Sequence, residues 1–170
     1  MIKESIVEAI NKQINAEMYS GYLYLSMAVD FGEKNLDGFE HWMRLQAQEE
    51  LDHGMRFMDY LQERGGHVEL ETIEKPEVEW KTPLEAFEYV YRHECKVTGM
   101  INDLVDLAEK EKDRATVNML QWFVDEQVEE EDSADEIVQK LKMVGDSPSA
   151  LLMMNERMAE RPVESGESEE

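Results

Sequence analysis

The sequence has little cysteine, proline or glycine, and it has no long apolar run. Its single cysteine, Cys95, excludes an intrachain disulfide and fits a reducing compartment. Four prolines and nine glycines in 170 residues leave room for long, uninterrupted helices. No apolar stretch approaches the roughly 18–20 residues that span a bilayer, and the N-terminus lacks the apolar core of a signal peptide. We therefore expect a soluble cytoplasmic protein built from helices.

Positive charge is also scarce. The chain has 17 lysines and arginines against 40 aspartates and glutamates, so its formal net charge is −23. This charge argues against nucleic acid or a membrane surface as a partner, because both are anionic and would repel the protein, whereas cations are attracted. With 42% hydrophobic residues the chain can still bury a core, and its length suits one domain.

Four long amphipathic segments are present, from about residue 5 to 32, 37 to 65, 82 to 111 and 114 to 144. Each has an apolar stripe at three- and four-residue steps, and a short fifth helix is expected after Pro148. The first stripe reads Ile6, Ile10, Ile14, Gly21, Tyr24, Leu25 and Ala28. Capping boxes are predicted at Ser5 with Glu8, at Asp37 with Glu40, and at Thr82 with Glu85.

Residues 66–81 have no helical period and form a long connection. Sixteen extended residues reach roughly 50 Å at about 3.3 Å each, which exceeds the roughly 42 Å of a helix of about 28 residues. The third helix should therefore run parallel to the second. The predicted fold is all-α, a four-helix bundle with one long crossover and a short C-terminal helix, over residues 1–160. Residues 161–170 are expected to be a disordered acidic tail.

Polar side chains interrupt the apolar stripe of every long segment. On the second segment, Glu50 and His53 share a face with Phe39, Met43 and Phe57. The residues in equivalent positions on the other three segments are Glu17, Glu94, Gln127 and Glu130. A buried carboxylate without a partner costs several kcal/mol, so its charge must be compensated. A carboxylate and an imidazole three residues apart on one helix can bind one metal ion, and we expect such an ion here.

An internal repeat supports this interpretation. A shift of 77 residues maps Glu17 onto Glu94, Glu49 onto Glu126, Glu50 onto Gln127 and His53 onto Glu130. The chain therefore looks like one helical hairpin used twice, with the two halves meeting around a polar site.

These motifs resemble the ferritin family over about residues 2–160. The matching stretches are Asn15-Ala16-Glu17 with Tyr24, Glu49 to His53, Glu94, and Trp122 to Glu130. The chain is similar to non-haem ferritins of bacteria and archaea. The resemblance implies a hollow homo-oligomeric cage, usually of 24 subunits, that oxidises Fe²⁺ to Fe³⁺ with O₂ or H₂O₂ and stores the ferric mineral.

The resemblance also implies a role for each site residue. Glu17 and His53 would bind the first iron, Glu50 would bridge, and Glu94 with Glu130 would hold the second. Gln127 would be a hydrogen-bonding neighbour, and Tyr24 would donate a hydrogen bond or an electron. A third iron site would comprise Glu49, Glu126, Glu129 and the shared Glu130. Haem is not expected, because Leu51 stands where bacterioferritins have their haem-binding methionine.

Two alternatives remain open. One is a diiron peroxidase or oxidase of the rubrerythrin kind, although a single cysteine excludes the Cys-x-x-Cys rubredoxin module that such chains usually carry. The other is a metal-free acidic helical scaffold, which the polar groups on buried faces argue against.

Overall fold

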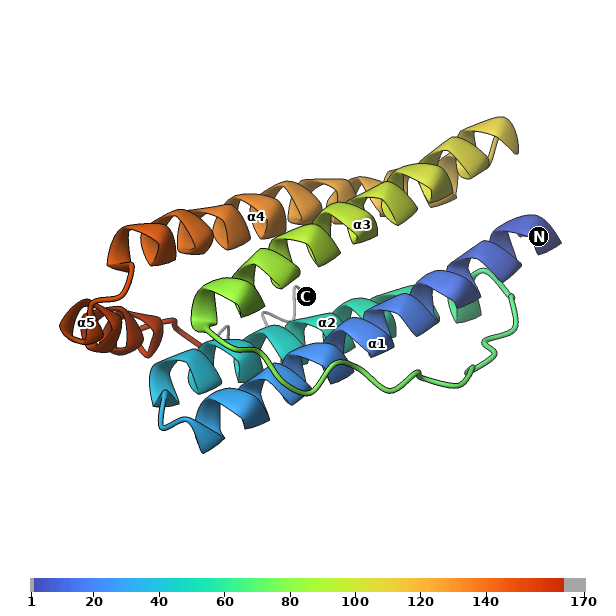
Figure 1. The fold of residues 1–170 in the computed structure, drawn as a ribbon. Coiled ribbons are helices and arrows are strands. Elements are labelled where there is room, and N and C mark those ends of the chain that lie inside the picture. Colours follow the sequence, from blue (N-terminus) through green and yellow to red (C-terminus); the bar gives the residue numbers. More distant parts are fainter. Residues whose placement is uncertain (1, 164–170) are drawn as a thin grey trace.

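The structure is a computed structural model that describes residues 2–163. Over this range the chain forms five helices and no strand: α1 (Glu4–Glu33), α2 (Asp37–Glu63), α3 (Pro83–Lys110), α4 (Arg114–Val144) and α5 (Pro148–Met158). Two hairpins, α1 with α2 and α3 with α4, lie side by side, and α5 packs across one end against α2 and α4 (Figure 1). The predicted all-α bundle with a short fifth helix is confirmed. None of the described helices is both long and apolar enough to cross a membrane.

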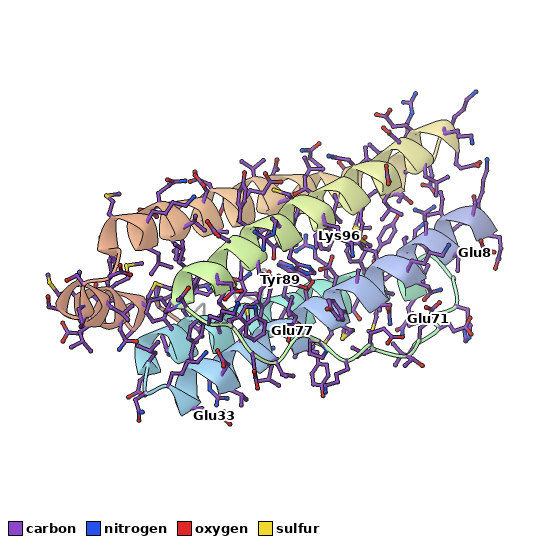
Figure 2. The ribbon with its side chains drawn as sticks, viewed as in Figure 1. Glu8, Glu33, Glu71, Glu77, Tyr89 and Lys96 are labelled. Atoms are coloured by element: carbon purple, nitrogen blue, oxygen red, sulfur yellow. The ribbon has the colours of Figure 1, made fainter. Side chains whose placement is uncertain are left out.

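The crossover between α2 and α3 runs along α1, as its length predicts (Figure 1). Side chains of α1 bind its backbone at successive heights. Asn11 donates to the His67 carbonyl at 2.9 Å, and Ser26 donates to the Glu77 carbonyl at 2.9 Å. Because the crossover returns the chain to the end at which α2 began, α3 runs parallel to α2. The carboxylates of the crossover, Glu71 and Glu77 among them, lie at the outer surface (Figure 2).

Only one of the three predicted capping boxes forms as expected. Thr82 accepts a hydrogen bond from the Glu85 backbone N–H at 3.1 Å, with Pro83 at the first helical position. The prediction at Ser5 is wrong, because the N-cap of α1 is Lys3, two residues earlier, and no side chain caps the helix. Ile2, just before the helix, is buried in the core and anchors this end of the chain.

The predicted box at Asp37 and Glu40 is also wrong, because the cap of α2 comes from α5. Asn155 Oδ1 accepts hydrogen bonds from the backbone N–H groups of Gly38 (2.9 Å) and Phe39 (3.2 Å). Such donors at a helix start have no partner within the helix, so a side chain from elsewhere can satisfy them. α5 therefore stabilises the start of α2 across the bundle end.

The apolar interior is divided into two clusters with a polar layer between them. One cluster contains Phe31, Phe39 and Phe87 near α5, and the other contains Ile10, Phe57 and Phe123 at the opposite end, where the rings of Phe57 and Phe123 stack at 3.9 Å. Between them lie the buried polar side chains of the middle of the bundle: Gln13, Glu17, Ser20, Gln46, Glu50, His53, His93, Glu94 and Gln127. The bundle therefore encloses a polar site at mid-height.

Not every residue of the predicted stripes faces the core. Leu25 is 40% exposed, whereas Leu23 and Met27 are fully buried. Leu25 shares an outer face of α1 with Tyr22 and Val29, which are also exposed. The prediction for Leu25 is wrong because Leu25 lies about 100° around the helix from the buried Tyr24 and falls outside the covered arc.

The chain packs back onto α2 shortly after α5 ends. Arg161, assigned to the predicted tail, contacts α2 through its side chain and its backbone carbonyl. Arg161 is therefore part of the folded domain, and residues 164–170 of the expected tail lie outside the described residues.

We predict that Gly38→Ala detaches α5 from α2. A Cβ atom at residue 38 would lie 1.7 Å from the Asn155 carbonyl oxygen, which belongs to helix backbone and cannot easily move. The unfolding free energy should fall by about 1–3 kcal/mol, measured by denaturant titration. Gly99→Ala is the matched control, because its Cβ meets nothing within 4 Å and alanine should stabilise α3 by about 0.5–1 kcal/mol. Equal stability of the two variants would contradict the proposed contact.

Candidate metal centre

Three side chains from α1 and α2 converge at mid-height. Glu17, Glu50 and His53 each place one ligand atom within 4.8 Å of the others, and all three are buried. Glu50 and His53 are one turn apart on α2, with 3.6 Å between Glu50 Oε2 and His53 Nδ1. The His53 ring is held edge-on against Trp122 and Phe123 of α4. These side chains could hold one metal ion.

The carboxylates of this group repel one another and are removed from water. Burial, with the charge of Glu50 as the next cause, raises the pKa of Glu17 to about 8. Burial and the charge of Glu130 raise the pKa of Glu50 to about 8. Both acids therefore hold a proton near neutral pH unless a cation replaces it.

Each of these two acids has a glutamine one turn before it. Gln13 Nε2 donates to Glu17 Oε1 at 2.7 Å, and Gln46 Nε2 donates to Glu50 Oε1 at 3.3 Å. The sequence predictions missed both glutamines, although an amide four residues before each acid, on the same buried face, was a visible signal. One carboxylate oxygen of each acid is thereby fixed.

Glu94 of α3 is held on the opposite side of the layer. The Tyr24 hydroxyl of α1 donates to Glu94 Oε1, and Gln127 Nε2 of α4 lies 3.4 Å from Glu94 Oε2 and 3.3 Å from its carbonyl oxygen. Burial, followed by the charge of Glu130, raises the pKa of Glu94 well above its usual value. Tyr24 and Gln127 thus lie where hydrogen-bonding neighbours of the site are expected.

Glu130 of α4 is joined to α2 through Gln46. Gln46 Nε2 donates to Glu130 Oε2 at 2.8 Å as well as to Glu50. Burial raises the pKa of Glu130 to about 7. Glu94 and Glu130 interact with the other acids through their charges, but the group of ligand atoms within 4.8 Å does not include them.

The remaining predicted ligands line a groove between α2 and α4. Glu49, Glu126 and Glu129 lie along this groove, which has a volume of about 1150 Å³ and also reaches His53 and Glu130. Glu49 Oε2 is 2.5 Å from a guanidinium nitrogen of Arg161, and Glu129 is exposed. The structure therefore places these acids beside the central group rather than within it.

Another buried pair escaped the sequence predictions. Ser20 Oγ donates to the Ala16 carbonyl at 3.1 Å, so its hydroxyl accepts from His93 Nε2, which lies 2.8 Å away. Burial lowers the pKa of His93 to about 4. His93 thus stays neutral beside Glu94, and a lone histidine in the sequence carried no sign of this role.

The central group fits a hard or borderline divalent cation. Glu17 Oε2 is buried beside the Glu50 carboxylate, and the two acids can bond to each other only if one of them is protonated. Such an oxygen requires a proton or a metal ion. Carboxylates with one imidazole are a ligand set that suits iron.

Comparison with known proteins agrees with this geometry. The family model for a ferritin-like domain matches residues 7–144. This chain belongs to the ferritin family. A bacterial non-heme ferritin of Bacteroides fragilis is 48% identical over 147 residues, 86% of this chain and 92% of the relative. The bacterial non-heme ferritin of Campylobacter jejuni is 40% identical, over 92% of this chain and 93% of the relative.

Solved ferritin structures superpose closely on this chain. The open pore ferritin of the hyperthermophilic archaeon Archaeoglobus fulgidus is 54% identical and has a TM-score of 0.94. The match covers 95% of this chain and 100% of that one. The ferritin resemblance drawn from the sequence motifs is therefore confirmed, as is the bundle fold.

We predict that the metal-free ferritin becomes less stable as pH rises from 6.5 to 8. The pKa values of Glu17 and Glu50 are about 8 in the folded protein, against 4.5 when exposed. The folded state therefore binds more protons than the unfolded state in this range, and stability falls with pH. The lowered pKa of His93 makes stability rise with pH instead, but mainly below its ordinary pKa of 6.5, outside this range. Melting curves at the two pH values measure the effect.

The control for this prediction is Glu50→Gln, which removes one of the titrating carboxyls while keeping its shape. The decrease in melting temperature between pH 6.5 and 8 should be smaller in this variant. A melting temperature that is constant or rises with pH in the wild-type protein would contradict the assigned protonation.

Proposed function

We propose that this ferritin oxidises Fe²⁺ at a diiron centre inside each subunit and deposits the ferric product within a cage. The observation that carries the proposal is the convergence of Glu17, Glu50 and His53 in a buried layer. Its relatives named bacterial non-heme ferritins support iron as the substrate. Glu17 and His53 bind the first iron, Glu50 bridges, and Glu94 with Glu130 bind the second.

Charge balance supports two irons rather than one. Four carboxylates from Glu17, Glu50, Glu94 and Glu130 carry four negative charges, which two Fe²⁺ ions neutralise. Iron binding then displaces the protons that these acids hold in the metal-free protein. Each Fe²⁺ gives up one electron, and O₂ takes the two electrons and two protons to form H₂O₂. H₂O₂ can serve as the oxidant in the same way and is reduced to water.

The neighbouring side chains position the ligands. Tyr24 and Gln127 fix the Glu94 carboxylate from two helices, and Gln46 fixes both Glu50 and Glu130. Tyr24, whose hydroxyl contacts a ligand of the second iron, is also placed to supply an electron. Ferric product passes from Glu130 to the third site formed with Glu49, Glu126 and Glu129 in the groove between α2 and α4.

Exposed apolar side chains support self-association. Tyr22, Leu25 and Val29 form an exposed stripe on α1 at three- and four-residue steps, and Val78 of the crossover is 46% exposed. Ser26 binds the crossover at Glu77, so this part of the crossover adjoins the stripe. Exposed apolar patches mark interfaces. We assign this surface to contacts between subunits of a 24-mer in the cytoplasm.

The two alternatives are weaker. A metal-free scaffold gives no reason to bring three buried ligand groups, Glu17, Glu50 and His53, within 4.8 Å of one another. A rubrerythrin-type peroxidase shares the bundle, but the named relatives over most of the chain are ferritins. Storage of many irons per subunit distinguishes a ferritin from such an oxidase.

We predict that Glu50→Ala and His53→Ala each slow rapid Fe²⁺ oxidation by at least about 100-fold. Loss of a residue that hydrogen-bonds a metal ligand typically costs about 10–100-fold, and loss of the ligand itself should cost more. Stopped-flow absorbance of the ferric product measures the rate. Glu109→Ala, which removes an exposed acid from α3, is the control and should oxidise iron normally. Wild-type rates in both site variants, with the cage intact, would reject the assigned centre.

We predict that the protein assembles into a particle of about half a megadalton, because 24 copies of a 19.9-kDa chain have that mass. Light scattering with and without iron should show an unchanged particle size and a rising mass as mineral accumulates. A monomer or dimer that binds only two or three irons per chain would instead favour a diiron oxidase.

A further inference from the structure

Arg161, which follows α5, contacts the metal centre from outside. Its Nη2 lies 2.5 Å from Glu49 Oε2, and its Nη1 donates to Gln46 Oε1 at 2.9 Å. The guanidinium carbon lies 4.4 Å from the centroid of the Trp42 ring, and the Arg161 carbonyl accepts from His41 Nε2 at 3.0 Å. Contacts on four α2 side chains hold this arginine against the helix that supplies Glu50 and His53.

Arg161 determines which way the Gln46 amide points. A guanidinium only donates hydrogen bonds, so it must face the amide oxygen of Gln46. The amide nitrogen is then directed at Glu130 Oε2 (2.8 Å) and Glu50 Oε1 (3.3 Å). Gln46 is 1% exposed, so water cannot readily replace these partners. A residue beyond the bundle is thereby linked to two carboxylates of the diiron centre.

The same arginine is bound to a carboxylate of the third site. Glu49 lines the groove with Glu126, Glu129 and Glu130, and its Oε2 is paired with the Arg161 guanidinium. A metal ion that binds Glu49 through this oxygen competes with the guanidinium for it. A metal ion on this oxygen places a second positive charge next to the guanidinium, and the two cations repel each other.

We propose that Arg161 is an internal cation that occupies Glu49 until iron binds the third site and displaces it. This inference rests on the proposed function, because it assumes iron at that site. Arg161 keeps the third site weak, so that iron fills the diiron centre first. Its displacement also releases the Gln46 amide, and Glu130 is then able to turn from Gln46 toward the third iron.

The experiment is a calorimetric titration of the intact, metal-free cage with Zn²⁺, which binds without being oxidised. The wild-type protein should show two tighter sites per chain and one weaker site. Arg161→Gln should tighten the weaker site roughly tenfold, a typical coupling between linked sites, and leave the tighter sites within about twofold. In a Glu49→Gln background the same substitution should have no effect.

Arg157→Gln is the matched control. Arg157 lies in α5 and lines the same groove, and its substitution removes the same charge, but its charge acts on Glu136 of α4, whereas Arg161 is the arginine bound to Gln46. Its effect on the weaker site should be small. Arg161→Lys keeps the charge but cannot bond Glu49 and Gln46 as a planar fork, so it should tighten the site by less than Arg161→Gln. It also provides the test if Arg161→Gln fails to assemble.

The outcomes separate the two proposals. If the wild-type protein lacks the two tighter sites, the diiron centre and this inference are both rejected. If the tighter sites are present but Arg161→Gln leaves the weaker site unchanged, or Arg157→Gln shifts it equally, the role of Arg161 alone is rejected. If neither the wild type nor Arg161→Gln shows a weaker site, the role of Arg161 is rejected as well.

Discussion

The burial of several carboxylates in one layer of the bundle is the constraint on which the rest of this structure depends. Glu17, Glu50 and Glu94 are each at most 2% exposed, and each lies close to another acid. Their charge must be neutralised by protons or by metal ions. The two apolar clusters above and below the layer supply the stability that permits this arrangement, because they bury large aromatic side chains from all four long helices.

The hydrogen-bonding neighbours convert a repulsive cluster into a defined site. Amides from Gln13, Gln46 and Gln127 each donate to a carboxylate, and the Tyr24 hydroxyl donates to Glu94. In the metal-free protein these donors fix the direction of at least one oxygen of each acid. Neutral donors suit this task, because a lysine or arginine at the same positions would compete with iron. The Arg161 guanidinium contacts the outer edge of the site, at Glu49.

The helical periods predicted the bundle because an apolar stripe must be covered by another helix, and the length of the crossover predicted that α3 is parallel to α2. Polar residues on those stripes identified the central side chains. The caps were less predictable. A Ser-x-x-Glu or Asp-x-x-Glu pattern describes local bonding, whereas α1 begins after Lys3 without a side-chain cap, next to the buried Ile2, and Asn155 caps α2 from more than 100 residues away.

The sequence by itself determined the fold class, the polar layer at mid-height and the ferritin family, since each depends on periodicity or on motifs within one helix. Only the tertiary structure decided which ligand atoms meet and what holds them. Glu17 joins Glu50 and His53 because the α1–α2 hairpin brings their faces together, while Glu94 and Glu130 are oriented by Tyr24, Gln127 and Gln46 from other helices. The contact of Arg161 with Glu49 depends on how α5 turns back onto α2, which no local pattern encodes.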